Sequence, residues 1–169
     1  MIDEYFSSIF LKYKRKGVLI DSNLLLLYFI GKYSPEMISK FKRTMKYTKD
    51  DFYLMTTILE YFNKIVTMPN ILTEVSNLSN QLPKARRIDF YEEFREQITV
   101  LFEQYVTSKE ASDVNHFTTL GLTDSVILKA AKGKYLVLTD EIQLYNILLR
   151  QDIDVININH LRAARWFSK

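Results

Sequence analysis

The sequence predicts an α/β fold with a central parallel sheet. Short apolar runs bounded by polar breaks alternate along the chain with longer segments in which apolar residues recur three and four positions apart. The short runs show no alternation of polar and apolar residues, which is typical of strands buried on both faces of a parallel sheet. The strands expected from this pattern are Val18–Ile20, Ile65–Thr67, 135–139 and Val155–Asn157. Repeated alternation of such strands with helices indicates an α/β domain.

Helices are expected before and after the first strand. Residues 4–16 have a helical pattern that Gly17 ends, and residues 23–31 are apolar nearly all round and end at Gly31. A further helix is expected to begin at Ser34-Pro35, because Ser is a favoured N-cap and Pro is favoured at the first helical position. Its apolar face would consist of Met37, Ile38, Phe41 and Met45.

Three helices are expected in the middle of the chain. Residues 51–62 have helical spacing, and Pro69 precedes a helix with Ile71, Val75, Leu78 and Leu82 on one face. Residues 83–106 are expected to form one long amphipathic helix, an elaboration on one side of a minimal core. The apolar residues that recur at helical spacing along it are Ile88, Tyr91, Phe94, Ile98, Leu101, Phe102 and Tyr105.

The last third of the chain contains the clearest strand, YLVLT at residues 135–139. A short helix or loop is expected at residues 111–120 and a helix at residues 123–132. Two more helices, at residues 141–150 and 160–167, are expected on either side of the last strand in the chain.

Composition indicates one ordinary globular domain over residues 1–169, and we expect it in the cytoplasm. Four Gly and three Pro argue against long linkers, and the lack of Cys excludes disulfides and thiolate metal sites. The first ten residues lack the basic region of a signal peptide, and no apolar run approaches the roughly 18 residues of a membrane span. A net charge of +3 permits a nucleic-acid partner without requiring one.

Acidic residues follow two of the expected strands. Asp21 comes directly after the strand VLI and is followed, two residues later, by the uncharged stretch LLLLYFI. Asp140 and Glu141 come directly after YLVLT. Open α/β sheets form their sites beyond the carboxyl ends of the strands, so these acids are candidate site residues.

Two further acids lie at the apolar margin of expected helices. Glu74 has Ile71 and Leu78 as its helical neighbours, and Asp124 has Ile127 and Leu128 three and four residues after it. Carboxylates in such places are costly to bury unless they are paired, and Mg²⁺ or Mn²⁺ would pair several of them at once. The alternative is that Asp21, Asp124, Asp140 and Glu141 cap or begin helices and that Glu74 is a rim residue of an amphipathic helix. Glu60 is the main rival to Glu74 as a site residue.

The motifs VLIDSN, TEVSNL, GLTDSVILKAA and VLTDEIQLYNIL, in this order, resemble the four acidic motifs of the PIN domain family of endoribonucleases. The resemblance covers roughly residues 17–160. It implies a three-layer α/β/α fold with a central, mostly parallel sheet of four or five strands. It also implies that Asp21, Glu74 and Asp124 hold one or two Mg²⁺ or Mn²⁺ ions, with Asp140 or Glu141 as the fourth acid. Supporting roles would fall to Ser22, Asn23 and Thr139.

The resemblance implies a magnesium- or manganese-dependent nuclease that hydrolyses RNA phosphodiesters with metal-activated water. The family includes toxins of toxin–antitoxin pairs and RNA-processing nucleases, so an antitoxin and a second copy of the chain are candidate partners besides RNA. Candidate contacts for RNA phosphates are the basic stretches 12–16, 40–49 and 84–87, although each also fits a solvated helix face.

Two other functions fit part of the pattern. The first is a catalytically weak PIN-like module that binds RNA or protein, since many family members have Asp where this chain has Glu141. The second is a receiver-type signalling domain, which requires a lysine after a late strand; the stretch VININH offers none. His116 and His160 are too far apart for a metal pair, and the abundant aromatic residues are expected in the core rather than as base-stacking surfaces.

Overall fold

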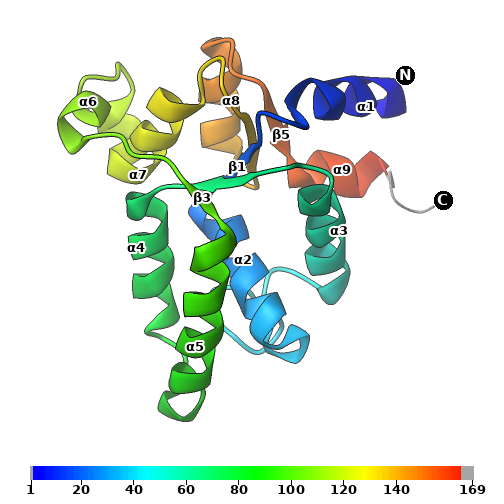
Figure 1. Cartoon of the computed structure of the whole chain (residues 1–169), viewed down its shortest axis with the longest axis vertical. Coiled ribbons are helices and arrows are strands. Elements are labelled where there is room, and N and C mark those ends of the chain that lie inside the picture. Colours follow the sequence, from blue (N-terminus) through cyan, green and yellow to red (C-terminus); the bar gives the residue numbers. More distant parts are fainter. Residues whose placement is uncertain (1, 165–169) are drawn as a thin grey trace.

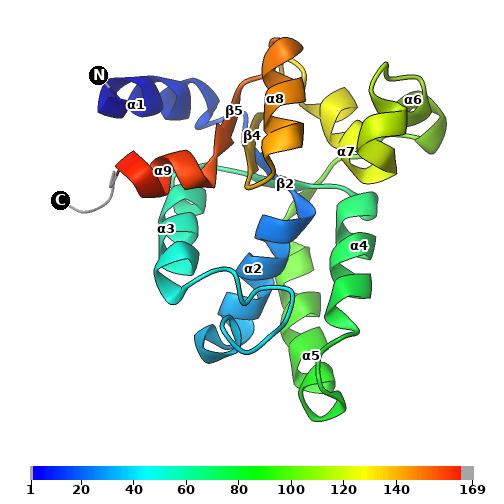
Figure 2. The same ribbon diagram turned by 180° about the vertical axis from the view of Figure 1, so that it is seen from behind.

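A computed structural model describes residues 2–164, without the side chains of residues 2, 3 and 164. It has a five-stranded parallel sheet with the order β3-β2-β1-β4-β5. The two opposite views place α2, α3, α4 and α5 on one side of the sheet and α6, α7 and α8 on the other (Figures 1 and 2). This is the α/β fold with a central parallel sheet and two helical layers that the sequence predicts.

Four of the five strands lie where the apolar runs place them. The strands are β1 (Val18–Ile20), β2 (Ile65–Thr67), β3 (Phe102–Glu103), β4 (Leu136–Thr139) and β5 (Val155–Asn157). The central strand β1 is fully buried and pairs with β2 on one edge and β4 on the other. Because all pairs are parallel, the carboxyl ends of the strands lie at the same end of the sheet.

The helices surround this sheet and mostly begin or end within a few residues of the expected positions. They are α1 (Ile2–Tyr13), α2 (Ser22–Tyr33), α3 (Lys49–Glu60), α4 (Pro69–Ser79), α5 (Lys84–Val100), α6 (Ser108–Ser112), α7 (Phe117–Ala131), α8 (Ile142–Arg150) and α9 (Ile158–Ala164). The backbone of α7 breaks at Gly121, whose φ is 74°. Residues 165–167, expected as the end of the last helix, lie outside the described residues. Among the described residues, no helix combines the length and apolarity that a membrane crossing needs.

The prediction of a helix that begins at Ser34 is wrong. The chain makes only one 3₁₀ turn, η1 (Pro35–Met37), and then continues in turns to α3, and the Ser34 side chain makes no capping hydrogen bond. The Thr44 hydroxyl donates to the carbonyl of Ile38 at 2.9 Å, so a side chain holds a backbone group within this irregular segment. Met45, expected on an apolar face, is 61% exposed.

The long helix predicted over residues 83–106 is confirmed for residues 84–100, but its extension to residue 106 is wrong. Helix α5 ends at Val100, Leu101 has an extended backbone, and the next two residues form β3 at the edge of the sheet. Residues 102 and 103 therefore belong to the sheet layer, and α5 is a helix beside it. Helical spacing continues past Val100 in the sequence, but the pairing of Val66 with Phe102 overrides it. Ile88 and Tyr105, expected on the apolar face, are 74% and 69% exposed.

Helix α2 is the buried helix next to the sheet. Its residues from Leu24 to Ile30 are all buried, in keeping with an apolar pattern nearly all round. Phe29 packs edge-on against Phe94 of α5. Gly31 lets α3 approach, since a Cβ at this position would lie 2.2 Å from the ring of Phe52. Close packing around α2 fixes the position of its N-terminus, where the candidate acids gather.

Candidate functional site

Asp21 is a buried carboxylate at the carboxyl end of β1 and is 2% exposed. Its Oδ1 accepts a hydrogen bond from the backbone N–H of Leu24 at 2.8 Å, which makes it the N-cap of α2. Its Oδ2 accepts hydrogen bonds from the Thr139 hydroxyl and from the backbone N–H of Asp140. Burial, followed by repulsion from Asp140, raises the pKa of Asp21 to about 8. Asp21 therefore both caps a helix and belongs to the candidate site.

Glu74 lies on the middle of α4, and Ser22 orients it. The Ser22 hydroxyl donates to Glu74 Oε2 at 2.8 Å, which joins the N-terminus of α2 to α4. Glu60, the alternative to Glu74 as a site residue, is exposed at the end of α3 and does not line the pocket described next.

A pocket of about 250 Å³ brings four of the predicted acids together. Its walls include Asp21, Glu74, Asp124 and Glu141, from the ends of β1 and β4 and from helices α4 and α7. Its other walls are Ser22, Leu120, Leu122 and Thr123. Burial, then repulsion from Glu141 and Glu74, raises the pKa of Asp124 to about 7. The pocket is therefore a confined region with several mutually repelling carboxylates.

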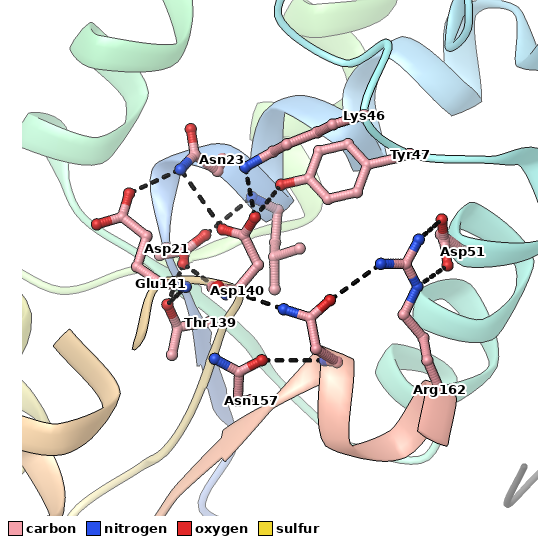
Figure 3. Close-up of polar contacts among 12 residues, drawn as sticks. Asp21, Asn23, Lys46, Tyr47, Asp51, Thr139, Asp140, Glu141, Asn157 and Arg162 are labelled. Carbon is pink, nitrogen blue, oxygen red and sulfur yellow. Dashed lines mark hydrogen bonds and ion pairs between the residues drawn. The ribbon is translucent and has the colours of Figure 1, made fainter. Parts of the chain in front are cut away.

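Asp140 and Glu141 point to different places, although the sequence offered both as the fourth acid. Glu141 lines the pocket, and its Oε1 accepts a hydrogen bond from the Asn23 side chain at 2.7 Å. Asp140 is not one of the pocket residues; its Oδ2 accepts hydrogen bonds from Lys46 Nζ at 2.5 Å and from the Tyr47 hydroxyl at 2.7 Å (Figure 3). The geometry favours Glu141 as the fourth acid of the pocket.

Thr139 and Asn23 connect these acids. The Thr139 hydroxyl donates to Asp21 and accepts from the backbone N–H of Glu141 at 3.0 Å. Asn23 donates to Glu141 and, at 3.5 Å, to Asp140 Oδ1. Burial, then repulsion from Asp140, raises the pKa of Glu141 as well. Each supporting residue named from the sequence thus contacts at least one of the acids. Figure 3 shows the contacts of Asn23 and Thr139.

Lys46 and Tyr47 were not identified from the sequence as individual site residues. They lie in the irregular segment before α3, on the opposite side of the cluster from Glu141 (Figure 3). Burial, then the charge of Asp140, raises the pKa of the Tyr47 phenol above its usual value. Lys46 lies in the basic stretch 40–49, but no motif signals its pairing with an acid far along the chain.

The donor atoms of the pocket suit a hard divalent cation, because carboxylate and hydroxyl oxygens are its preferred ligands. The raised pKa values of Asp21 and Asp124 fit this assignment, since a cation would offset the repulsion between the carboxylates. As they stand, the described residues contain no group of three or more acidic or histidine side chains that could hold a metal ion. The pocket thus has donor atoms of a suitable kind, but its carboxylates are not arranged as a ligand group.

Comparisons of the chain with protein-family models, with curated proteins and with solved structures found no match.

Proposed function

We propose that the protein is a divalent-metal-dependent endoribonuclease, similar to PIN domain nucleases, that hydrolyses RNA phosphodiesters. The observation that supports this best is the gathering of Asp21, Glu74, Asp124 and Glu141 in one pocket from four separate segments. Helix capping explains Asp21, but it does not explain Glu74 in the middle of α4, nor why four acids share a pocket in which they repel one another. A site for a cation explains their placement.

Asp21, Glu74, Asp124 and Glu141 would hold Mg²⁺ or Mn²⁺. When bound, the ion supplies charge to the scissile phosphate and lowers the pKa of a water molecule. Hydrogen bonds from Thr139, Ser22 and Asn23 orient Asp21, Glu74 and Glu141 respectively. This support fixes carboxylates whose own rotamers would otherwise vary.

Lys46 adds positive charge beside the acids. It is about half exposed and pairs with the buried carboxylate of Asp140. A phosphate that approaches the pocket meets this cation next to the acids, which reduces the repulsion between RNA and the site. By the same resemblance, an antitoxin or a second copy of the chain is a proposed partner, and the cytoplasm is the proposed location.

The second candidate is a catalytically weak PIN-like module that binds RNA or protein. Two features favour it: Asp140 is bound to Lys46 and Tyr47, and the acids of the described residues do not form a ready ligand group. In this function the pocket would keep its shape, and divalent ions would bind weakly or not at all.

Cleavage of a mixed RNA pool with Mg²⁺ or Mn²⁺ tests the nuclease. The variants Asp21→Asn and Asp124→Asn should lose metal-dependent cutting, whereas the control Asp89→Asn, at an exposed position on α5, should cut like the wild type. Thermal melting with and without the metal is measured on the same samples. Absence of cutting together with absence of metal-induced stabilisation would refute the nuclease and favour the binding module.

A further inference from the structure

A second and larger pocket, of about 470 Å³, adjoins the acid pocket. The two share Glu74, Leu122 and Thr123 as walls. The rest of the larger pocket is formed by α4 on one side and by the segment that follows β3 on the other. Its volume falls within the range of about 300–1,000 Å³ that small-ligand pockets occupy. The shared walls place the two pockets side by side.

The walls of the second pocket combine polar and apolar side chains and are almost uncharged. Asn70, Thr73 and Asn77 line it from α4, and Glu74, at the shared wall, is its one charged residue among those described. The side chains of Asn70 and Asn77 make no hydrogen bond within residues 2–164. Because the pocket offers no cation and one carboxylate, it does not suit a phosphate. It suits a neutral group with several hydrogen-bonding atoms.

Tyr105 provides the opposite wall and is 69% exposed, so much of its side chain is open to a ligand. The backbone around it is fixed on both sides. The N–H of Gln104 donates to the carbonyl of Thr67 at 2.8 Å, and Thr107 caps α6 through a reciprocal pair of hydrogen bonds with Glu110. The ring is thus presented on a rigid segment, and its hydroxyl has no partner within residues 2–164.

We propose that this second pocket binds one unpaired nucleobase of an RNA whose neighbouring phosphate lies in the acid pocket. The inference rests on the proposed nuclease function. A nucleobase is neutral, has a flat face that stacks on an exposed tyrosine, and has edge atoms that pair with amides such as Asn70 and Asn77. A base within a duplex offers neither a free face nor a free edge, so the subsite selects an unpaired nucleotide next to the cut.

The test is binding without catalysis. A labelled, unstructured RNA oligonucleotide and an abasic ribose-phosphate chain of equal length are titrated with protein in Ca²⁺, a hard cation that carboxylate oxygens bind, in place of Mg²⁺ or Mn²⁺, and affinity is read by fluorescence anisotropy. The wild type should bind the base-bearing chain more tightly. Tyr105→Ala should weaken that binding by about 5-fold or more and should leave abasic binding unchanged. Tyr105→Phe should bind like the wild type.

Matched variants separate stacking from general effects. Tyr53→Ala removes a ring of similar exposure, 53%, from α3 outside the pocket and should not change RNA affinity. Asn77→Ala should change the ratio of affinities for adenine- and uracil-containing chains, because an amide reads base edges.

The proposal is overturned if Tyr105→Ala binds the base-bearing chain as tightly as the wild type, or if the abasic chain binds equally well. It is also overturned if no RNA binds, because the pocket would then have to bind a different class of ligand. Base-dependent binding that is lost in Tyr105→Ala supports the subsite even when the wild type cuts no RNA with metal. In that case the proposed nuclease function is refuted, and the proposed nucleobase subsite is supported.

Discussion

Lys46 Nζ lies 2.5 Å from Asp140 Oδ2, and the two residues are unequally exposed: the Lys46 side chain is 53% exposed and the Asp140 side chain 7%. A nearly buried carboxylate therefore depends on a cation that reaches it from the solvent side. The Tyr47 hydroxyl donates to the same oxygen at 2.7 Å. This cluster ties the irregular segment before α3 to the carboxyl end of β4 and turns Asp140 away from the acid pocket.

Removal of the Lys46 charge should destabilise the protein. Lys46→Met keeps the aliphatic stem but leaves the Asp140 carboxylate with neutral partners, so the free energy of unfolding should fall by at least about 1 kcal/mol. Lys49→Met is the control, because Lys49 pairs with Glu36 at the exposed surface and should change stability by no more than about 0.5 kcal/mol. Urea denaturation measures both. Equal losses for the two variants would contradict the role given to Lys46.

The two adjacent acids after β4 should differ in their effect on RNA cleavage. Glu141→Gln should abolish metal-dependent cutting, because it removes a carboxylate from the pocket. Asp140→Asn should reduce cutting by about 10- to 100-fold at most, as expected of a residue that supports a site without lining it. Initial rates at saturating Mg²⁺ or Mn²⁺ provide the comparison. A larger loss of cutting for Asp140→Asn than for Glu141→Gln would indicate that Asp140 is the fourth acid.

Stability should fall as pH rises when divalent ions are absent. The folded protein holds a proton on Asp21 up to a pKa of about 8, whereas the unfolded chain releases it near 3.8. Between these values the folded state binds more protons, so the free energy of unfolding decreases with pH, by at most about 1.4 kcal/mol per unit from this group. Chemical denaturation in EDTA at several pH values should show this slope. The slope should be smaller in Asp21→Asn, and an unchanged slope would exclude Asp21 as its source.

Gly31 should not tolerate a methyl group. Alanine normally favours a helix over glycine by up to about 1 kcal/mol, but a Cβ at this position would overlap the ring of Phe52. Gly31→Ala should therefore destabilise the protein by about 1–3 kcal/mol, the usual cost of overpacking. The double variant Gly31→Ala with Phe52→Leu should recover part of the loss. Thermal unfolding measures the series, and additive losses in the double variant would argue against a direct clash.

The sequence predicts the sheet and the acids well because both depend on short-range patterns. An apolar run that ends at an acid is sufficient to place Asp21 at the carboxyl end of β1, and the same pattern places Glu141 after β4. Glu74 and Asp124 could be placed because each interrupts the apolar margin of a helix. Parallel strands then bring these separate positions to one edge of the sheet.

The features that the sequence did not predict depend on contacts between distant segments. Lys46 and Tyr47 lie in a segment without helical or strand structure, so no periodicity indicates that they reach Asp140. Strand β3 has two residues, too few for a strand pattern, and its pairing with β2 decides its conformation. For the same reason the sequence places Tyr105 on a helix face, although Tyr105 follows β3, the edge strand of the sheet, and is exposed.

The pairing of β1 with β4 also determines when the molecule can become complete during synthesis. Val18 pairs with Leu136, so one edge of the central strand remains open until most of the chain has left the ribosome. Until then the nascent chain has β2 as the neighbour of β1 and lacks the Thr139 hydroxyl that binds Asp21. Closing so long a loop is slow, because its entropy is lost before the strand pair forms. A chain truncated before residue 136 would therefore have an open edge on β1 and an incomplete acid cluster.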